Sequence, residues 1–257
     1  MRFKKNYKEN INSLMNNVIK RNNKLVKVYS DEVKKLPSFV NTELIISKLK
    51  YKDYFLNCKF DKHSCKLRYY ENSEFFLDEN NIKEVADILN DLHSTPSHDF
   101  KEFDVIKILN FWNNEIKYEL TNWETKIVNL VNDYKGKKTL CHNDLHLGNF
   151  LNVKDEIKLI DYDFAGVNYS TFDIVSFISE QEVNEKDRKV FLESYYKNKN
   201  KNIEIDELIL FEDFHNIFWK SWSKYMYKKT NNKEFLELNK IRNENLKNRF
   251  YAKYTYK

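Results

Sequence analysis

A polar segment followed by a short alternating stretch constrains the fold of this chain more than any other part of its sequence. Residues 141–149 read Cys-His-Asn-Asp-Leu-His-Leu-Gly-Asn, and residues 150–160 then alternate apolar with polar side chains around a charged turn at 154–156. Such alternation is typical of two strands joined by a tight turn. The pattern therefore predicts a β-hairpin that returns Asp161 to the side of Asn149.

The polar residues around this hairpin match the needs of phosphoryl transfer from ATP. That reaction needs a carboxylate beside the attacking hydroxyl and oxygen ligands that hold magnesium on the phosphates. We assign Asp144 as the carboxylate. Asn149 and Asp161 offer the amide and carboxylate oxygens that Mg²⁺ prefers. We therefore predict a phosphotransferase site in which Asp144, Asn149 and Asp161 are catalytic and the last two bind the metal.

The order His142-x-Asp144-x-x-x-x-Asn149, followed by Asp161, resembles the catalytic loop of choline/ethanolamine kinases and aminoglycoside phosphotransferases. The resemblance implies an α+β, protein-kinase-like fold with two lobes. The small, β-rich N-terminal nucleotide-binding lobe would span residues 1–72. The larger, mostly α-helical catalytic and substrate-binding lobe would span residues 73–257. Protein kinases carry an arginine where this chain has Asn143, so a protein kinase is unexpected.

A longer signature after Asp161 points to the choline kinase branch. Residues 161–168, and Phe172-Asp173-Ile174 running on to Glu180, resemble the choline kinase signature, which aminoglycoside enzymes normally lack. In choline kinases the glutamate at the end of this signature faces the substrate ammonium, and Glu180 occupies that place. An ordinary surface glutamate is the alternative interpretation.

The aromatic cluster near the C-terminus also fits a cationic substrate. Phe218-Trp219-Lys220-Ser221-Trp222 resembles the paired tryptophans of the choline kinase pocket. Trp219, Trp222 and Tyr225 share one helix face by their spacing, although such a stripe is more often core packing. A quaternary ammonium donates no conventional hydrogen bond, so carboxylate charge and aromatic faces must recognise it. The family match favours Asp144, Glu180, Trp219, Trp222 and Tyr225 as substrate-binding residues.

The N-terminal region contains the predicted nucleotide contacts. Kinase-fold enzymes place a phosphate-binding lysine on a strand, and Lys27 lies in the strand-like run 24–29. Its predicted partner is Glu43, in an expected helix over residues 40–50. Asn16 belongs to the stretch aligned with the phosphate loop, which lacks the glycine usual in the family, and Tyr70 belongs to the expected hinge beside the adenine. Lys20 and Lys24 are rivals for the role of Lys27.

Helical periodicity covers most of the rest of the chain. Apolar residues recur at helical spacing from Ile82 to Leu92. A longer helix is expected from Val105 to Ile127, without a break and packed under the catalytic loop. The region 207–251 also has a helical pattern, interrupted near residues 230–232.

Charge and hydropathy exclude several classes of function. The 44 basic and 39 acidic residues, with a net charge of +5, are spread along the chain instead of forming the cluster typical of a nucleic-acid footprint. No apolar run is long enough to span a bilayer, and the N-terminus has no signal-peptide pattern. We therefore expect a cytoplasmic protein with a small-molecule substrate, no nucleic-acid partner and no membrane insertion. The sequence does not indicate an oligomeric state.

These observations predict an enzyme that uses ATP and Mg²⁺ to phosphorylate the hydroxyl of choline, or of a close amino alcohol, to give phosphocholine. Two other interpretations stay open. An ethanolamine, thiamine or aminoglycoside kinase of the same fold would keep the magnesium residues, and the last two would not need the Glu180 and tryptophan cage. A non-catalytic nucleotide-binding module would explain the missing glycines.

Overall fold

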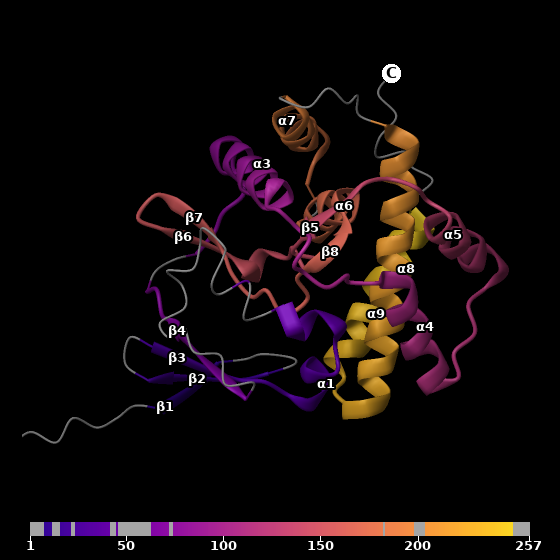
Figure 1. Ribbon diagram of the computed structural model, residues 1–257, viewed down its shortest axis with the longest axis horizontal. Helices are drawn as coiled ribbons and strands as arrows, with labels where there is room; N and C mark the ends of the chain where they lie inside the picture. Colours follow the sequence, from indigo (N-terminus) through magenta and orange to yellow (C-terminus); the bar gives the residue numbers. More distant parts are fainter. Residues whose placement is uncertain are drawn as a thin grey trace, which may run out of the picture.

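An antiparallel sheet forms the first part of the chain, and helices dominate the remainder (Figure 1). The computed structural model describes residues 8–11, 16–21, 24–41, 45, 63–71, 74–181, 183–197 and 204–248. Four strands make up the sheet in the order β1-β2-β3-β4, and their bounds are Lys8–Ile11, Asn17–Arg21, Lys24–Val28 and Ser64–Arg68. This arrangement confirms the prediction of a β-rich N-terminal part followed by a mostly helical one.

Strand β3 places Lys27 on the buried side of the sheet. Lys27 pairs with Val18 of β2 and Cys65 of β4, and it is only 5% exposed. A small apolar cluster lies next to this strand and contains Tyr29, Val33, Phe39, Cys65 and Leu67. The short helix α1 (Asp31–Lys34) and the 3-10 turn η1 (Pro37–Asn41) follow β3 directly. The sheet thus holds a charged group against the interior of the molecule.

Two small β-structures frame the catalytic loop. Strand β5 (Lys138–Cys141) pairs with β8 (Gly166–Tyr169), while β6 (Phe150–Val153) and β7 (Glu156–Leu159) form the predicted hairpin. Lys154 and Asp155 at its turn both have positive φ angles, 54° and 65°. Two successive residues in this conformation are the mark of a tight two-residue turn. The hairpin prediction is therefore confirmed.

The C-terminal part packs around one long helix. Helix α8 spans Ile205–Thr230, and the helices α4, α5, α6 and α9 pack against it. Figure 1 shows α8 as a long column beside the catalytic strands, with α9 next to its lower half. The remaining bounds are Glu79–Ser94 for α3, Val105–Ile116 for α4, Asn122–Asn132 for α5, Ser170–Glu180 for α6, Glu185–Tyr196 for α7 and Glu234–Asn248 for α9.

The prediction of one unbroken helix from Val105 to Ile127 is wrong. Helix α4 ends at Ile116, because Lys117 adopts the left-handed conformation with φ 54°. Helix α5 begins after Thr121, whose side chain accepts from the backbone of Glu124 while the Glu124 carboxylate accepts from Thr121. This reciprocal capping box is a strong helix start signal. Both helices pack on α8 instead of forming one support beneath the catalytic loop.

The other helix predictions have different outcomes. The helix over residues 82–92 is confirmed as α3, and the predicted interruption near 230–232 is confirmed by the left-handed Asn231 that ends α8. The expected helix over residues 40–50 lies almost entirely outside the described residues. No helix in the described ranges is both long enough and apolar enough to cross a bilayer.

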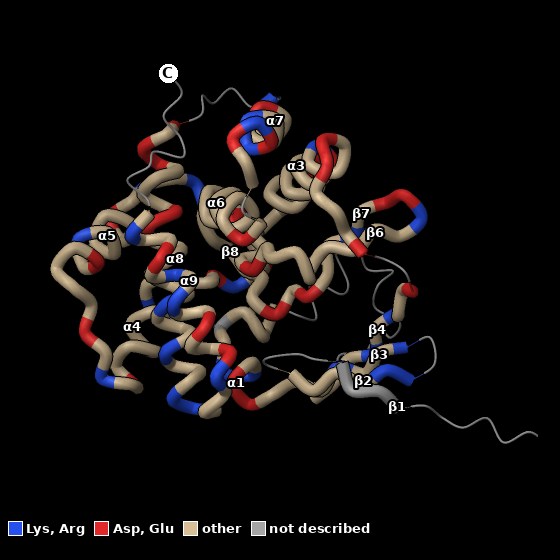
Figure 2. The backbone as a smooth tube through the Cα atoms, turned by 180° about the vertical axis from the view of Figure 1, so that it is seen from behind, with Lys and Arg blue, Asp and Glu red and all other residues tan. Residues whose placement is uncertain are grey.

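Acidic and basic residues alternate along the same helices in the described part of the chain (Figure 2). Several of them form pairs within one turn, such as Lys83 with Glu79 on α3 and Lys240 with Glu237 on α9. Exposed pairs of this kind keep a helix surface solvated and contribute little stability. The charge distribution of the fold thus agrees with the even spread seen in the sequence.

Candidate active site

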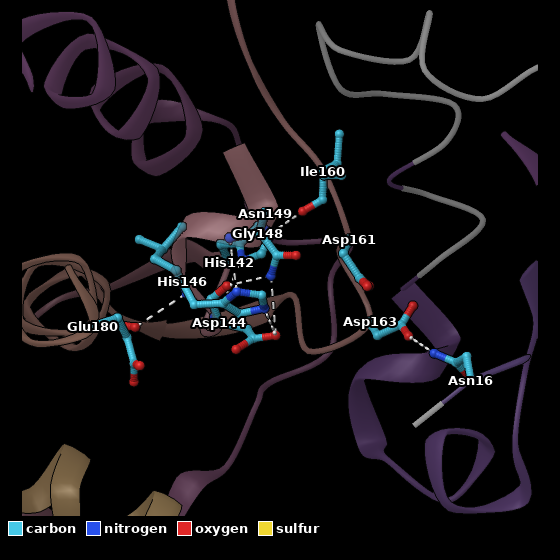
Figure 3. A network of polar contacts seen from close by, with 12 residues as sticks. Asn16, His142, Asp144, His146, Gly148, Asn149, Ile160, Asp161, Asp163 and Glu180 are labelled. Atoms are coloured by element: carbon cyan, nitrogen blue, oxygen red, sulfur yellow. Dashed lines mark hydrogen bonds and ion pairs between the residues drawn. The ribbon is translucent and has the colours of Figure 1, made fainter. Parts of the chain in front are cut away.

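Asp144 and Asn149 lie together in the loop that joins β5 to β6 (Figure 3). The side-chain Nδ2 of Asn149 donates to the backbone carbonyl of Asp144 over 2.8 Å and lies 3.3 Å from its carboxylate Oδ2. Asn149 is buried, whereas the side chain of Asp144 is 25% exposed. The carboxylate of Asp144 is therefore restrained by its neighbour and still accessible.

The hairpin brings Asp161 back to this loop. The backbone N–H of Ile160 donates to the carbonyl of Asn149 over 2.9 Å. On the other side, Nε2 of His142 contacts the Ile160 carbonyl at 2.9 Å, while Nδ1 of His142 accepts from the backbone N–H of Asp144. These two contacts assign the ring proton of His142 to Nε2. His142 thus links the loop before Asp144 to the segment that ends in Asp161.

A buried carboxylate on α6 supports the backbone of the catalytic loop. The two oxygens of Asp173 each accept a hydrogen bond of 2.7 Å, from the backbone N–H groups of His142 and Asn143. Asn143 has a positive φ of 68°, so these bonds stabilise a conformation that a non-glycine residue rarely adopts. His93 contacts Asp173 through Nε2 at 3.1 Å and the Tyr195 hydroxyl through Nδ1 at 2.6 Å.

Sequence reasoning missed the role of Asp173. The signal in the sequence was an acidic residue between two large apolar residues, Phe172 and Ile174. Both are fully buried in the structure, and a charge buried beside them needs partners. Two further residues of the same region act on the loop. The Ser176 hydroxyl accepts from the Leu145 N–H at 3.2 Å, and the Gln181 side chain donates to the Leu145 carbonyl at 2.8 Å. Helix α6 and its C-terminal cap residue therefore hold the first half of the loop, from His142 to Leu145.

Lys27 bridges two carboxylates across the two parts of the molecule. Its Nζ lies 2.6 Å from Asp161 Oδ1 and 2.7 Å from Asp163 Oδ2. Burial opposes the charge of Lys27, but the two carboxylates outweigh it and raise the pKa of Lys27. Burial likewise works against ionisation of Asp161, yet Lys27 keeps the pKa of Asp161 below its usual range.

Asp163 was not among the predicted site residues. Burial, together with the negative charge of Asp161, raises the pKa of Asp163 to about 6. Its spacing of two residues from Asp161 was only a weak signal in the sequence, because side chains two apart point to the same side only where the chain is extended. The chain is not a regular strand here, because Asp161 has a positive φ of 63°.

The residues predicted to contact the nucleotide do not all lie together in the structure. Asn16 donates through Nδ2 to Asp163 over 2.6 Å and accepts the Ser30 N–H through Oδ1 at 3.1 Å. In Figure 3 this places Asn16 beside Asp163, on the side away from Asp144. Tyr70 packs against the small apolar cluster of the sheet. Glu43 and residues 12–15 of the predicted phosphate loop lie outside the described residues.

The predicted cation-binding aromatics gather on α8. The rings of Trp219 and Trp222 stand at 90° to each other with centroids 5.3 Å apart, and they are 6% and 8% exposed. Trp219 also contacts Phe164, just after Asp163, at 5.4 Å. The Tyr225 hydroxyl instead donates to Glu32 of α1 over 2.7 Å, and its ring stacks near Trp112. Trp219 and Trp222 therefore form a nearly buried corner within the core of the C-terminal part, while the hydroxyl of Tyr225 reaches the N-terminal part.

Glu180 lies at the C-terminal end of α6, next to the Gln181 that contacts the catalytic loop. In the view of Figure 3, Glu180 and the pair formed by Asp161 and Asp163 lie on opposite sides of Asp144. A separate cavity of about 640 Å³ is lined by residues around the end of α3, β5 and the start of α6, including His93, Lys138 and Tyr169. None of the predicted site residues lines that cavity, so the cavity is separate from the predicted site.

Comparison with protein families distinguishes choline/ethanolamine kinases from the other enzymes that share this catalytic loop. A family model described as choline/ethanolamine kinase matches residues 60–250, which is more than half of the chain. The chain belongs to the choline/ethanolamine kinase family. The matched range includes Asp144, Asn149, Asp161 and Glu180. Lys27 lies before it, so the importance of Lys27 rests on its contacts in the structure.

Individual relatives agree with this family. A LicA homolog from Metamycoplasma hominis is 29% identical over 128 residues, which are 48% of this chain and 51% of that protein. The chain thus spans about half the length of the curated relatives it matches. The choline kinase LicA from Streptococcus pneumoniae has a similar structure, with a TM-score of 0.78 at 18% identity, covering 94% of this chain and 93% of that one.

A more distant structure extends the likeness beyond the choline/ethanolamine kinase family. The GDP complex of aminoglycoside 2'-phosphotransferase-IIIa gives a TM-score of 0.69 at 14% identity, covering 95% of this chain and 93% of that one. At such identities the likeness establishes the fold. The protein-kinase-like fold predicted from the catalytic loop is therefore confirmed.

Proposed function

We propose that this protein transfers the γ-phosphoryl group of ATP to the hydroxyl of choline, or of a close amino alcohol, to give phosphocholine and ADP. The observation that carries the proposal is the convergence of Asp144, Asn149 and the Lys27-bound pair of carboxylates in a chain of this family. Phosphoryl transfer depends chiefly on positioning and on charge stabilisation. This arrangement offers both.

Asp144 is proposed to orient the substrate hydroxyl and to accept its proton. Its carboxylate is partly exposed and has Asn149 as a fixed neighbour, so an incoming hydroxyl meets a restrained acceptor. A base held within hydrogen-bond reach of the proton it removes typically contributes about 10²–10⁴-fold to the rate. The Nδ2 of Asn149 and the carboxylate of Asp173 also hold the carboxylate and backbone of this loop in place.

The residues near Lys27 fit a magnesium site. Asp161 and Asp163 share one lysine, and the raised pKa of Asp163 reflects both burial and negative charge that Lys27 does not fully balance. Asn149 and Asp161 would hold the ion, with Asp163 as a further carboxylate ligand. When bound, Mg²⁺ would neutralise charge on the phosphates of ATP. Lys27 would steady the same phosphates, with Glu43 as its predicted partner.

The acceptor end of the site is proposed to recognise an ammonium group. Glu180 supplies the negative charge, and the corner formed by Trp219 and Trp222 supplies aromatic faces. A cation over an indole gains roughly 0.5–2 kcal/mol, more in a site that excludes water. Choline and ethanolamine both satisfy these groups, and the assay below distinguishes them.

The test is ADP release from MgATP with choline, ethanolamine, thiamine or kanamycin as acceptor. We expect turnover with choline that falls by about 10²-fold or more in Asp144→Asn, as loss of a general base predicts. Asp155→Asn, an exposed turn position, is the matched control and should keep the wild-type rate. Turnover with thiamine or kanamycin alone would retain the catalytic loop and reject the cation site. ATP binding without turnover would indicate a non-catalytic nucleotide-binding module.

A further inference from the structure

Glu180 is already paired with a charged residue from another helix. Nη2 of Arg242, on α9, donates to Oε1 of Glu180, and the two side chains are 8% and 17% exposed. Hydrogen bonds between ionised groups are stronger than neutral ones and hold their geometry better. Helix α9 has no residue in the predicted site, and it touches that site through this contact and through the ring of Phe235, which packs on Trp222.

A neutral histidine completes the surroundings of the same oxygen. Nε2 of His215, on α8, lies 3.7 Å from Glu180 Oε1, and His215 is fully buried. Burial, together with the positive charge of Arg242, holds the pKa of His215 well below its usual range. Glu180 and Arg242 are therefore the charged members of this group, and their charges cancel.

The ion pair with Arg242 makes the two carboxylate oxygens of Glu180 different from each other. Oε1 is committed to Arg242, whereas Oε2 has no hydrogen-bond partner among the residues that the structure describes. A glutamate at a helix end has several rotamers, and an unpaired carboxylate tends to turn toward water. Arg242 restrains that choice, because both side chains are mostly shielded from solvent.

We propose that Arg242 is a positioning residue for the substrate ammonium. It fixes the Glu180 carboxylate through one oxygen and leaves the other to face the cation, while His215 neighbours both Glu180 and the ring of Trp219. Because the Glu180 and Arg242 pair has no net charge, the cation is recognised at contact instead of being attracted from a distance. This inference rests on the function proposed above, and it adds a specificity role for α9.

The experiment compares Arg242→Gln, Arg242→Lys, Glu180→Gln and the double variant Glu180→Gln/Arg242→Gln. We expect Arg242→Gln to raise the KM for choline about tenfold, the usual scale for loss of a charge-assisted hydrogen bond, and to leave the KM for MgATP within about twofold. Arg242→Lys should restore part of the loss. The double variant should equal Glu180→Gln alone, since residues that act through one another are not additive.

A neutral substrate separates positioning from packing. The carbon isostere of choline, in which a tert-butyl group replaces the trimethylammonium, has no charge for Glu180 to contact. We expect its KM to be the same in the wild type and Arg242→Gln. Asn239→Ala is the control for α9 packing, because Asn239 bonds Lys220 and Ser223 of α8 and makes no contact with Glu180. It should leave the KM for choline unchanged.

Each alternative result has a distinct meaning. Additive effects of the two substitutions, an equal loss with the neutral isostere, or an unchanged KM in Glu180→Gln would overturn the role of Arg242. If Arg242→Gln does not fold, Arg242→Lys and Glu180→Gln still decide the question through the same KM comparison. A wild-type protein without turnover of any amino alcohol would instead reject the proposed function itself.

Discussion

Asp163 has an unusual ionisation, and its effect on stability can be measured. Its pKa is raised from 3.8 to about 6, so the folded chain binds this proton more tightly than the unfolded chain does. Between these two values, rising pH removes the proton from the unfolded state first, and the contribution of Asp163 to the free energy of unfolding falls. We expect the free energy of unfolding of the wild type, minus that of Asp163→Asn, to fall with rising pH when both are measured by urea unfolding at several pH values from about 4 to about 6.

The expected size of this effect is about 1.4 kcal/mol for each unit by which the pKa is raised. Neighbouring groups titrate outside this window. The lowered pKa of Asp161 affects stability only in more acidic solution, and the raised pKa of Lys27 only in alkaline solution. Asp155→Asn, an exposed turn position, serves as the control. Parallel pH profiles for wild type and Asp163→Asn would show that Asp163 ionises normally.

At the scale of single residues, the sequence predicted candidates whose chemical roles could be inferred from their order along the chain. Asp144, Asn149 and Asp161 were predicted together because the reaction needs these groups at these spacings. The roles of Asp163 and Asp173 were not predicted, because these roles depend on partners far away in the sequence, such as Lys27 for Asp163. A carboxylate that binds backbone N–H groups from another element leaves only a faint local pattern.

Among the elements, the β6–β7 hairpin offers a direct test of turn chemistry. Lys154 and Asp155 adopt left-handed conformations, which lysine disfavours and the Asn-Gly pair accepts readily. We expect Lys154→Asn with Asp155→Gly to stabilise the protein by about 1 kcal/mol, or roughly 2–4 °C in Tm. Thermal unfolding measures the change, and kcat should stay the same. Lys154→Ala with Asp155→Ala is the control, since alanine keeps the strain and should give no gain.

Helix boundaries show where periodicity stops being informative. Apolar spacing correctly predicted α3 and the break after α8, yet it joined α4 and α5 into one helix. The interruption at Lys117 has no proline or glycine to announce it. Only the Thr121 and Glu124 capping box in the sequence indicated a new start.

For the molecule as a whole, Tyr225 connects the C-terminal helices to the N-terminal part. Its hydroxyl donates to Glu32 of α1, and its ring is only 2% exposed. We expect Tyr225→Phe to lower the free energy of unfolding by about 1 kcal/mol, the value of one hydrogen bond, with an unchanged KM for choline. Urea unfolding and steady-state kinetics measure the two quantities. A KM for choline raised severalfold, with unchanged stability, would place Tyr225 in the cation site as the sequence predicted.

Lys27 lies on β3, whereas both of its carboxylate partners come from the segment after β7. A lysine fixed in one conformation has already lost roughly 1.5–2 kcal/mol of side-chain entropy. The ion pairs with Asp161 and Asp163 cause this loss of side-chain entropy during folding, before any phosphate group binds. If Lys27 binds the phosphates as proposed, a nucleotide meets an ammonium group whose direction is already set, and its binding free energy need not be spent on ordering that side chain.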